Sequence, residues 1–142
     1  MVFLMAQEHM QLIPIGIVHS ELTNPSDAPR QGSEGGPSAW LEIDPAYQEG
    51  LLGIRPGSEL ILLTWLHLAE RDHLQTHPRG DRSKPLTGVF SSRSPHRPNP
   101  IGLHRVTVLA VERNWIQVHP LEAVDGTPII DIKSVVTDVE DR

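Results

Sequence analysis

Apolar residues alternate with polar ones in several short stretches of the chain, which is the pattern of half-buried β-strands. Leu12–Leu22 has isoleucine at every second position from 13 to 17, and Pro14 within it favours an edge or the first turn of a strand. Ser38–Ile43 alternates over a shorter distance. Glu59–Leu68 is a continuous apolar run of about ten residues without helical polar spacing, and it predicts a buried central strand.

The second half of the chain continues the same pattern. Gly102–Glu112 and Trp115–His119 are rich in β-branched residues and predict a hairpin that turns at Arg113-Asn114. Thr87–Phe90 predicts a short strand, and Thr127–Val136 predicts the last one, after a turn at Asp125-Gly126. Six or seven short strands without a long amphipathic helix predict a mainly β chain, either a barrel or a sandwich.

Two segments interrupt the strands with polar and turn-forming residues. Thr23–Pro37 is dense in proline, glycine and serine and predicts a loop, and Ala69–Leu86 predicts a long polar one. Between them, Asp44 followed by Pro45 predicts the capped start of a small helix that ends at Gly50 or Gly53.

Gly88–Leu103 is the densest proline segment of the chain. Prolines at 95, 98 and 100 disfavour helix at the residues before them, so we expect a stiff, extended ribbon. The ribbon would present four polar side chains in a fixed order, namely Arg93, His96, Arg97 and Asn99. A plain surface loop between two strands is the competing interpretation, but polar groups held this tightly are where function is expected first.

Composition bounds the class of protein. A length of 142 residues predicts one domain, and the absence of cysteine excludes disulfides, thiolate nucleophiles and cysteine-bound metal clusters. The start of the chain lacks the basic head and long apolar stretch of a signal peptide, and no run approaches the length of a membrane span. These features predict a soluble, cytoplasmic protein without a membrane partner.

The charge of −6 is unevenly distributed. Residues 71–105 contain seven basic and two acidic side chains, whereas the segments before and after them carry −7 and −4. An acidic protein does not coat nucleic acid indiscriminately, but this basic segment can receive an anionic ligand or one stretch of RNA backbone. A solvated charged loop is equally compatible with the composition.

The common motifs of catalysis and nucleotide binding are absent. No G-x-G-x-x-G joins a strand to a helix, and neither a P-loop nor a G-x-S-x-G elbow occurs. His73 and His77 lie four residues apart, but no carboxylate has the H-E-x-x-H spacing and Pro78 disfavours a helix, so no metal site is predicted. What remains are polar patches beside strands: Pro29-Arg30-Gln31, His67 at the end of the apolar strand, the ribbon, and the Asp125–Lys133 segment.

Taken together, GVFSSRSPHRPNPIGL and the later LEAVDGTPIIDIK closely resemble the TsaA-like family, also called TrmO, over residues 11–135. The resemblance implies a compact β-barrel with short helices and long functional loops, occupying residues 11–137 between terminal extensions 1–10 and 138–142. It also implies a homodimer that uses S-adenosylmethionine to methylate N(6) of threonylcarbamoyl-adenosine beside the anticodon of tRNA.

Matching positions assign roles to individual residues. The methyl donor is expected to contact Pro29, Arg30, Gln31, His67, Leu68, Arg93, Leu103, Asp125, Gly126, Thr127 and Pro128. The candidates for the substrate side are Arg97, Asn99, Asp131 and Lys133. The acceptor nitrogen must lose a proton, for which a carboxylate such as Asp125 or a histidine is a candidate base. Lys133 is a candidate to polarise the carbamoyl oxygen instead, and the residues do not single one out.

The chain departs from the family pattern in three places. Ser134 follows the D-I-K motif where proline and tyrosine are usual, His96 takes a commonly apolar or aromatic position, and the sequence ends at Arg142 without the extra domain of longer bacterial members. Two alternatives therefore stay open beside tRNA methylation. One is a methyltransferase for a different, small-molecule substrate, and the other is a non-catalytic module that binds S-adenosylmethionine or RNA.

Overall fold

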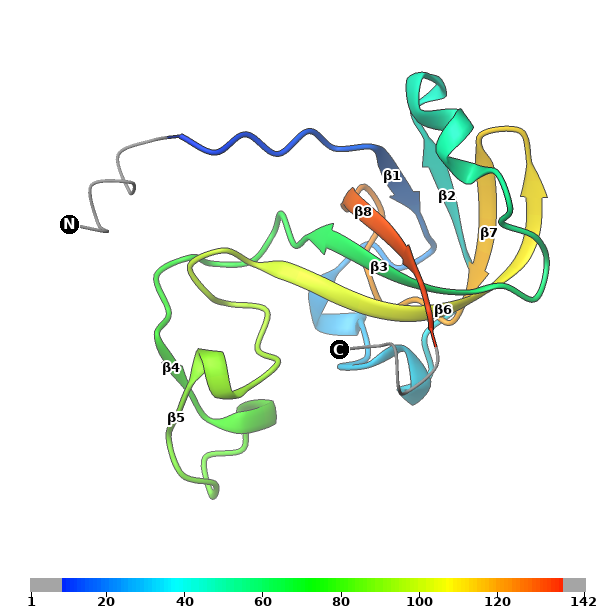
Figure 1. Ribbon diagram of the computed structural model, residues 1–142. Helices are drawn as coiled ribbons and strands as arrows, with labels where there is room; N and C mark the ends of the chain where they lie inside the picture. Colours follow the sequence, from blue (N-terminus) through cyan, green and yellow to red (C-terminus); the bar gives the residue numbers. More distant parts are fainter. Residues whose placement is uncertain (1–8, 137–142) are drawn as a thin grey trace.

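Six antiparallel strands close on themselves in the computed structural model, which describes residues 9–136 (Figure 1). The order around the barrel is β1-β2-β7-β6-β3-β8. The strands are β1 (Gly16–His19), β2 (Ala39–Ile43), β3 (Glu59–Trp65), β6 (Ile101–Glu112), β7 (Trp115–His119) and β8 (Pro128–Ser134). The mainly β, barrel-forming prediction is confirmed. The expected extension 138–142 lies outside the described residues, as does all but the end of the extension 1–10.

Every second side chain of a strand points into the barrel, and these side chains form the core. In β3, Leu60, Leu62 and Thr64 are buried, whereas the residues between them are partly exposed on the outer wall. The expectation of a continuously buried strand over Glu59–Leu68 is therefore wrong in two respects, because the strand ends at Trp65 and has only one buried face. A closed barrel has an inside and an outside, and here the outer face of the apolar run is uncovered in the single chain.

Two predicted elements are shorter than their apolar patterns. β1 begins at Gly16 instead of Leu12, because Pro14 has no backbone N–H to contribute to the ladder. β8 ends at Ser134 instead of Val136. The small helix after Asp44 is present as a 3₁₀ helix, η4 (Pro45–Leu51), and the Asp44 side chain accepts a hydrogen bond from the Ala46 N–H at 2.9 Å, as a capping residue does.

The predicted turns are confirmed. β6 and β7 form the hairpin through Arg113 and Asn114, where Arg113 adopts a φ of 56° and the Asn114 amide donates to the Ile43 carbonyl at 2.7 Å. Asp125 and Gly126 form the turn before β8, and the φ of 82° at Gly126 is one that glycine adopts readily. The loop between β1 and β2 holds two short 3₁₀ helices, η2 (Pro25–Asp27) and η3 (Gly32–Glu34).

Residues 66–100 leave the end of β3 and return at the start of β6 as a separate arm outside the barrel (Figure 1). The arm contains a two-stranded sheet of β4 (Gln75–Thr76) and β5 (Thr87–Gly88). It also contains the 3₁₀ helices η5 (Pro78–Gly80) and η6 (Val89–Ser91). No helix within residues 9–136 is long and apolar enough to cross a membrane.

The proline ribbon is not extended throughout. The expected strand Thr87–Phe90 stops at Gly88, and η6 follows because Val89 turns into a fully buried site. The Ser92 N–H and hydroxyl both hydrogen bond to the Val89 carbonyl and close this turn. Bends follow at Pro95 and over residues 97–99, and the Arg97 side chain returns to the Val89 and Ser92 carbonyls, so the segment folds back on itself.

Candidate functional site

The turn at Asp125 is fixed to the chain that leaves β1. The Asp125 N–H donates to the Leu22 carbonyl at 2.6 Å, and its side chain accepts from the Ser20 N–H at 3.0 Å. The Gly126 N–H donates to the Val18 carbonyl at 2.8 Å. Asp125 is nevertheless exposed, so the turn presents a positioned carboxylate at the mouth of the barrel. Thr127 does not contribute its hydroxyl, because this group is buried and donates to the Val124 carbonyl.

His67 lies beside this turn. It follows β3 in the first turn of the arm and is exposed, together with Leu68. A Cβ on Gly126 would lie 4.0 Å from His67 Nε2, so the two turns are neighbours although 59 residues separate them in the chain. The structure thus brings together two patches that the sequence could only name separately.

The loop of Pro29, Arg30 and Gln31 meets the arm. Arg79 of the arm donates to Glu34 at 2.7 Å, and Arg30 Nη2 lies 3.6 Å from the Cβ position of Gly80. The hydrogen bond from Arg79 holds the pKa of the Glu34 carboxyl below its usual value, and it raises the pKa of Arg79 in turn. Both side chains are exposed, so this contact orients the loop more than it stabilises the fold.

A buried polar chain, which sequence reasoning missed, lies beneath the same loop. His104 is 5% exposed, its Nε2 hydrogen bonds with the Thr64 hydroxyl at 2.7 Å, and its Nδ1 bonds to Glu122. If Nδ1–H donates to the carboxylate, Nε2 accepts from the hydroxyl, which satisfies every group. The other carboxylate oxygen lies 2.8 Å from the Cβ position of Gly32, next to Gln31. The chain of contacts therefore joins the Arg30 loop to the end of β3. One signal was available: His104 shares the inward face of its strand with Val106.

The ribbon residues are used partly to fold the arm. The Arg97 guanidinium donates to the carbonyls of Val89 and Ser92, and Asn99 accepts from Arg71 Nη2 at 3.0 Å. Arg71 also donates to the Pro98 carbonyl and lies over the Trp65 ring, 5.1 Å from its centroid. The substrate contacts expected of Arg97 and Asn99 remain predictions, and Arg93 is exposed on the arm.

Leu103, Asp131 and Lys133 lie on the outer wall of the barrel instead of at its mouth. Leu103 pairs with Leu63, which pairs in turn with Asp131, and Lys133 lies 3.4 Å from the Asp131 carboxylate. Lys133 is five residues beyond Pro128 on β8, which corresponds to about 16 Å at the usual rise per residue. The structure therefore separates the two candidate catalytic residues, Asp125 and Lys133.

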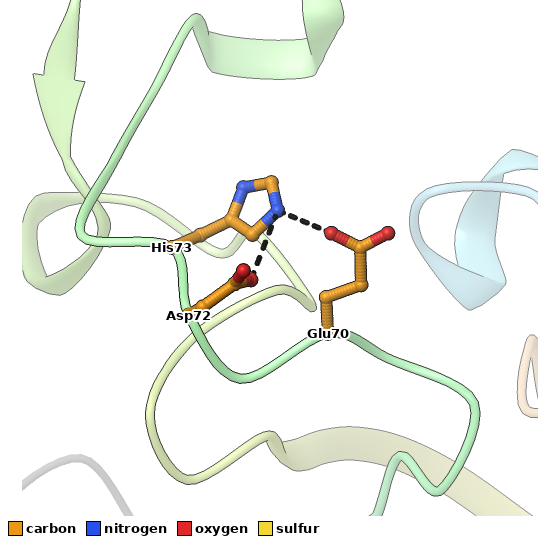
Figure 2. Close-up of side chains that lie close together, drawn as sticks. All are labelled: Glu70, Asp72 and His73. Atoms are coloured by element: carbon orange, nitrogen blue, oxygen red, sulfur yellow. Dashed lines mark hydrogen bonds and ion pairs between the residues drawn. The ribbon is translucent and has the colours of Figure 1, made fainter.

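A carboxylate and imidazole cluster lies on the arm (Figure 2). His73 Nε2 lies 2.6 Å from Glu70 and 3.6 Å from Asp72, and the two acidic residues are exposed. The His96 ring lies near His73, with its Nδ1 accepting from the Glu70 N–H at 2.9 Å. Three ligand atoms this close are able to hold a cation, but an exposed ion pair accounts for the geometry equally well. The expectation that the protein binds no metal stays a prediction.

A groove of about 590 Å³ lies on a different part of the barrel. It runs between η4, the start of β3 and the end of β8, and Tyr47, Leu51 and Asp131 are among the residues that line it. Asp131 is the one predicted site residue in this lining.

Comparison with known proteins adds to this geometry. Residues 17–141 match the tRNA-methyltransferase O N-terminal domain. A probable S-adenosyl-L-methionine-binding protein of Methanothermobacter thermautotrophicus is 40% identical over 136 residues, covering 96% of this chain and 97% of that protein. An S-adenosyl-L-methionine-binding protein of Archaeoglobus fulgidus is 43% identical over 131 residues, covering 92% of this chain and 93% of that protein.

Solved structures agree with these matches. A crystal structure of TrmO from Pseudomonas aeruginosa superposes on 94% of this chain with a TM-score of 0.75 and 29% sequence identity. The chain spans 59% of the length of that structure. With the barrel, the domain match and the near full-length relatives in agreement, the chain belongs to the family of the tRNA-methyltransferase O N-terminal domain.

Proposed function

We propose that this protein binds S-adenosylmethionine at the mouth of its barrel and transfers the methyl group to an adenosine of tRNA. The observation that supports the donor site is that His67 and the Asp125 turn, which are far apart in the chain, are neighbours at the barrel mouth. The Arg30 loop contacts the arm at Gly80, and its Gly32 lies against the side chain of Glu122, three residues before Asp125. The relatives named as S-adenosyl-L-methionine-binding proteins support the choice of ligand.

The chemistry of these residues fits S-adenosylmethionine. Its carboxylate suits the Arg30 guanidinium, which is exposed and presents a fork of donors. Its ammonium and ribose hydroxyls suit carboxylate and carbonyl oxygens, which the Asp125 turn supplies. His67 is exposed beside that turn and is suited to cover a flat ring, and the next residue, Leu68, is exposed as well.

The residues of the chain contribute mainly position and proton removal. When bound, the donor supplies an electrophilic methyl group for an in-line displacement. The amino nitrogen of threonylcarbamoyl-adenosine has a delocalised lone pair, so a base must take its proton as attack proceeds. We assign this role to Asp125, because one of its carboxylate oxygens is held by the Ser20 N–H while the residue stays exposed.

A homodimer is the second part of the proposal. The outer faces of β3 and β6 bear a row of partly exposed apolar side chains, with Ile101 43% and Leu103 49% exposed beside Leu63 and Trp65. Contiguous apolar surface of this kind is typical of an interface, and a two-fold axis would place it against itself. In such a dimer, Lys133 and Leu103 of one copy are able to reach the donor site of the other copy. Within a single chain, both lie on the outer wall, away from that site.

Ile101→Glu is expected to convert the dimer to monomer in sedimentation velocity, and a wild-type monomer at micromolar concentration contradicts the dimer.

Labelled S-adenosylmethionine and tRNA with or without the threonylcarbamoyl group provide the main test. We expect methyl transfer only to the modified tRNA, and a loss of kcat of about 100-fold or more for Asp125→Asn. Glu49→Gln, an exposed carboxylate on η4, is the matched control and should retain full turnover.

Two results would refute the proposal. Calorimetry that finds no affinity for the donor below the millimolar range refutes the donor site. Full turnover in folded Asp125→Asn refutes the assignment of the base, and full turnover in Lys133→Ala would do the same for the role expected of Lys133.

A further inference from the structure

The arm is the basic part of an acidic protein. Residues 66–100 contain six arginine and lysine residues and three carboxylates, a net charge of +3, while the whole chain carries −6. The rest of the chain therefore carries −9. A polyanion that approaches this protein is repelled by the barrel and attracted by the arm, so the charge distribution orients any nucleic acid before contact.

Apart from the exposed Arg93, which is an expected donor contact, the cations of the arm divide into two groups. Arg71, Arg79 and Arg97 are engaged by other groups of the protein. Arg82 and Lys84 lie on the exposed tip between η5 and β5, and within residues 9–136 neither forms an ion pair. Cations that the fold itself does not use are available to phosphates.

The arm also holds an aromatic side chain outward, six residues after Lys84 in the chain. Phe90 is 82% exposed, although the preceding Val89 is fully buried. The backbone at this point is pinned, because the Val89 N–H donates to the Leu74 carbonyl at 2.9 Å and the Val89 carbonyl accepts from Arg97. An exposed ring on a fixed backbone is suited to stacking, because little freedom is lost when a flat partner binds.

The arm also lies next to the proposed donor site. Arg79 bonds to Glu34 of the loop that carries Arg30, and Gly80 lies close to Arg30 itself. His67, in the first turn of the arm, lies beside the Asp125 turn. A strand of nucleic acid on the arm is thus able to reach the methyl donor without leaving the protein surface.

We propose that the arm is the docking surface for an unpaired loop of RNA, with Phe90 stacking on a base and with Arg82 and Lys84 contacting phosphates. The inference rests on the proposed function, and it names the part of the protein that would hold the tRNA. Unpaired bases of RNA loops stack on aromatic side chains, whereas bases within a helix are inaccessible to them. An adenosine beside the anticodon lies in such a loop.

The test measures binding of threonylcarbamoylated tRNA to the full chain by fluorescence anisotropy at several salt concentrations. Phe90→Ala should weaken binding by about 5- to 100-fold, because one stacking contact is lost, with an unchanged salt dependence. Phe90→Trp should restore the affinity. Calorimetry with S-adenosylmethionine should give the wild-type affinity for both variants, which shows that the arm is folded.

Removal of the cations should have a different signature. In the double variant Arg82→Ala and Lys84→Ala, the slope of log affinity against log salt should become shallower by about 1.4, the value for two contacts to a single strand. Leu52→Ala, which removes a 95% exposed apolar side chain, and Arg55→Ala, which removes a cation near the opposite end of β3, are the matched controls and should bind tRNA normally.

Three outcomes would overturn the inference. If wild-type protein binds tRNA and the arm variants bind it equally well, the docking surface lies elsewhere while the proposed function stands. If wild-type protein binds S-adenosylmethionine but no tRNA, both fail. If Phe90→Ala leaves tRNA affinity intact but dissociates the protein in sedimentation velocity, the arm contacts a second copy of the chain instead.

Discussion

The barrel and the arm are stabilised in different ways. Inside the barrel, Leu41, Leu62, Ile116 and their neighbours are fully buried, and the few buried polar groups are hydrogen bonded. In the arm only Val89 and Pro100 are buried. Its shape depends on hydrogen bonds from side chains such as Arg97 to backbone carbonyls, and on prolines that limit the alternatives of the unfolded chain.

This difference explains where the candidate site lies. A barrel that is stabilised by apolar burial tolerates varied loops at its mouth, and loops on a rigid scaffold are the usual carriers of function. The Asp125 turn leads into β8 of the barrel, and His67 lies in the first turn of the arm. The loop that carries Arg30 contacts Gly80 of the arm and, through Gly32, the side chain of Glu122. The site is therefore at the junction, and changes to the two regions should have separable effects.

The largest effect is expected from the core of the barrel. Leu62→Ala removes a fully buried side chain and should lower the free energy of unfolding by about 2–5 kcal/mol, measured by chemical denaturation. Leu86→Ala, at a 55% exposed position in the arm, should change it by no more than about 0.5 kcal/mol. Equal losses for the two variants would mean that the arm is as tightly packed as the barrel.

A somewhat smaller loss of unfolding free energy is expected from a substitution at Gly102. This residue lies on β6 beside the buried polar chain that joins β6 to β3. A Cβ at this position would overlap the Thr64 hydroxyl and lie 2.7 Å from His104 Nε2, so Gly102→Ala should cost about 1–3 kcal/mol. Gly50→Ala is the control, since a Cβ there meets nothing within 4 Å. Unchanged stability in Gly102→Ala would show that this polar chain is not rigid.

Loss of Arg97 should affect the arm alone. Arg97→Ala removes the charged donor to the Val89 and Ser92 carbonyls, so amide hydrogen exchange at these residues should become about tenfold faster or more. Exchange in β3 and β6 should not change. Arg82, which makes no such contact with the residues that the structure describes, is the control, and Arg82→Ala should leave the arm as protected as in the wild type.

The smallest effect is expected from pH. The pKa of Glu34 is lowered by the Arg79 hydrogen bond, so this contact is fully present above the ordinary value of 4.5 and is lost as pH falls through the lowered folded-state pKa. NMR shifts of the Gly80 amide should report this titration below pH 4.5. In Glu34→Gln that titration should be absent, and a persistent transition would assign it to another group.

Local chemistry was predictable from the sequence. Alternation, one continuous apolar run and segments rich in β-branched residues located every barrel strand. Asp44 marked the start of η4, and the turns at Arg113 and Asp125-Gly126 were predicted from their residues. These features depend on neighbours within a few positions, so the sequence contains the information directly. The family resemblance, which the comparisons confirm, supplied the barrel and the ligand in addition.

Contacts between distant segments were not predictable from the sequence. The apolar run of β3 did not reveal that one face is buried and the other is exposed, and the 3₁₀ turn at Val89 was hidden within a proline-rich ribbon. The chain of His104, Thr64 and Glu122 was missed for the same reason, because it joins residues up to 58 positions apart.

The sequence by itself thus determined the strands, the turns, the basic segment and the set of candidate residues. The tertiary structure decided that His67 lies beside the Asp125 turn and that Arg30 lies beside Gly80 of the arm, while Lys133 lies along the outer wall of the barrel. The physical reason is that strand register and barrel closure set these distances, and both arise from pairing between segments that are far apart in the chain.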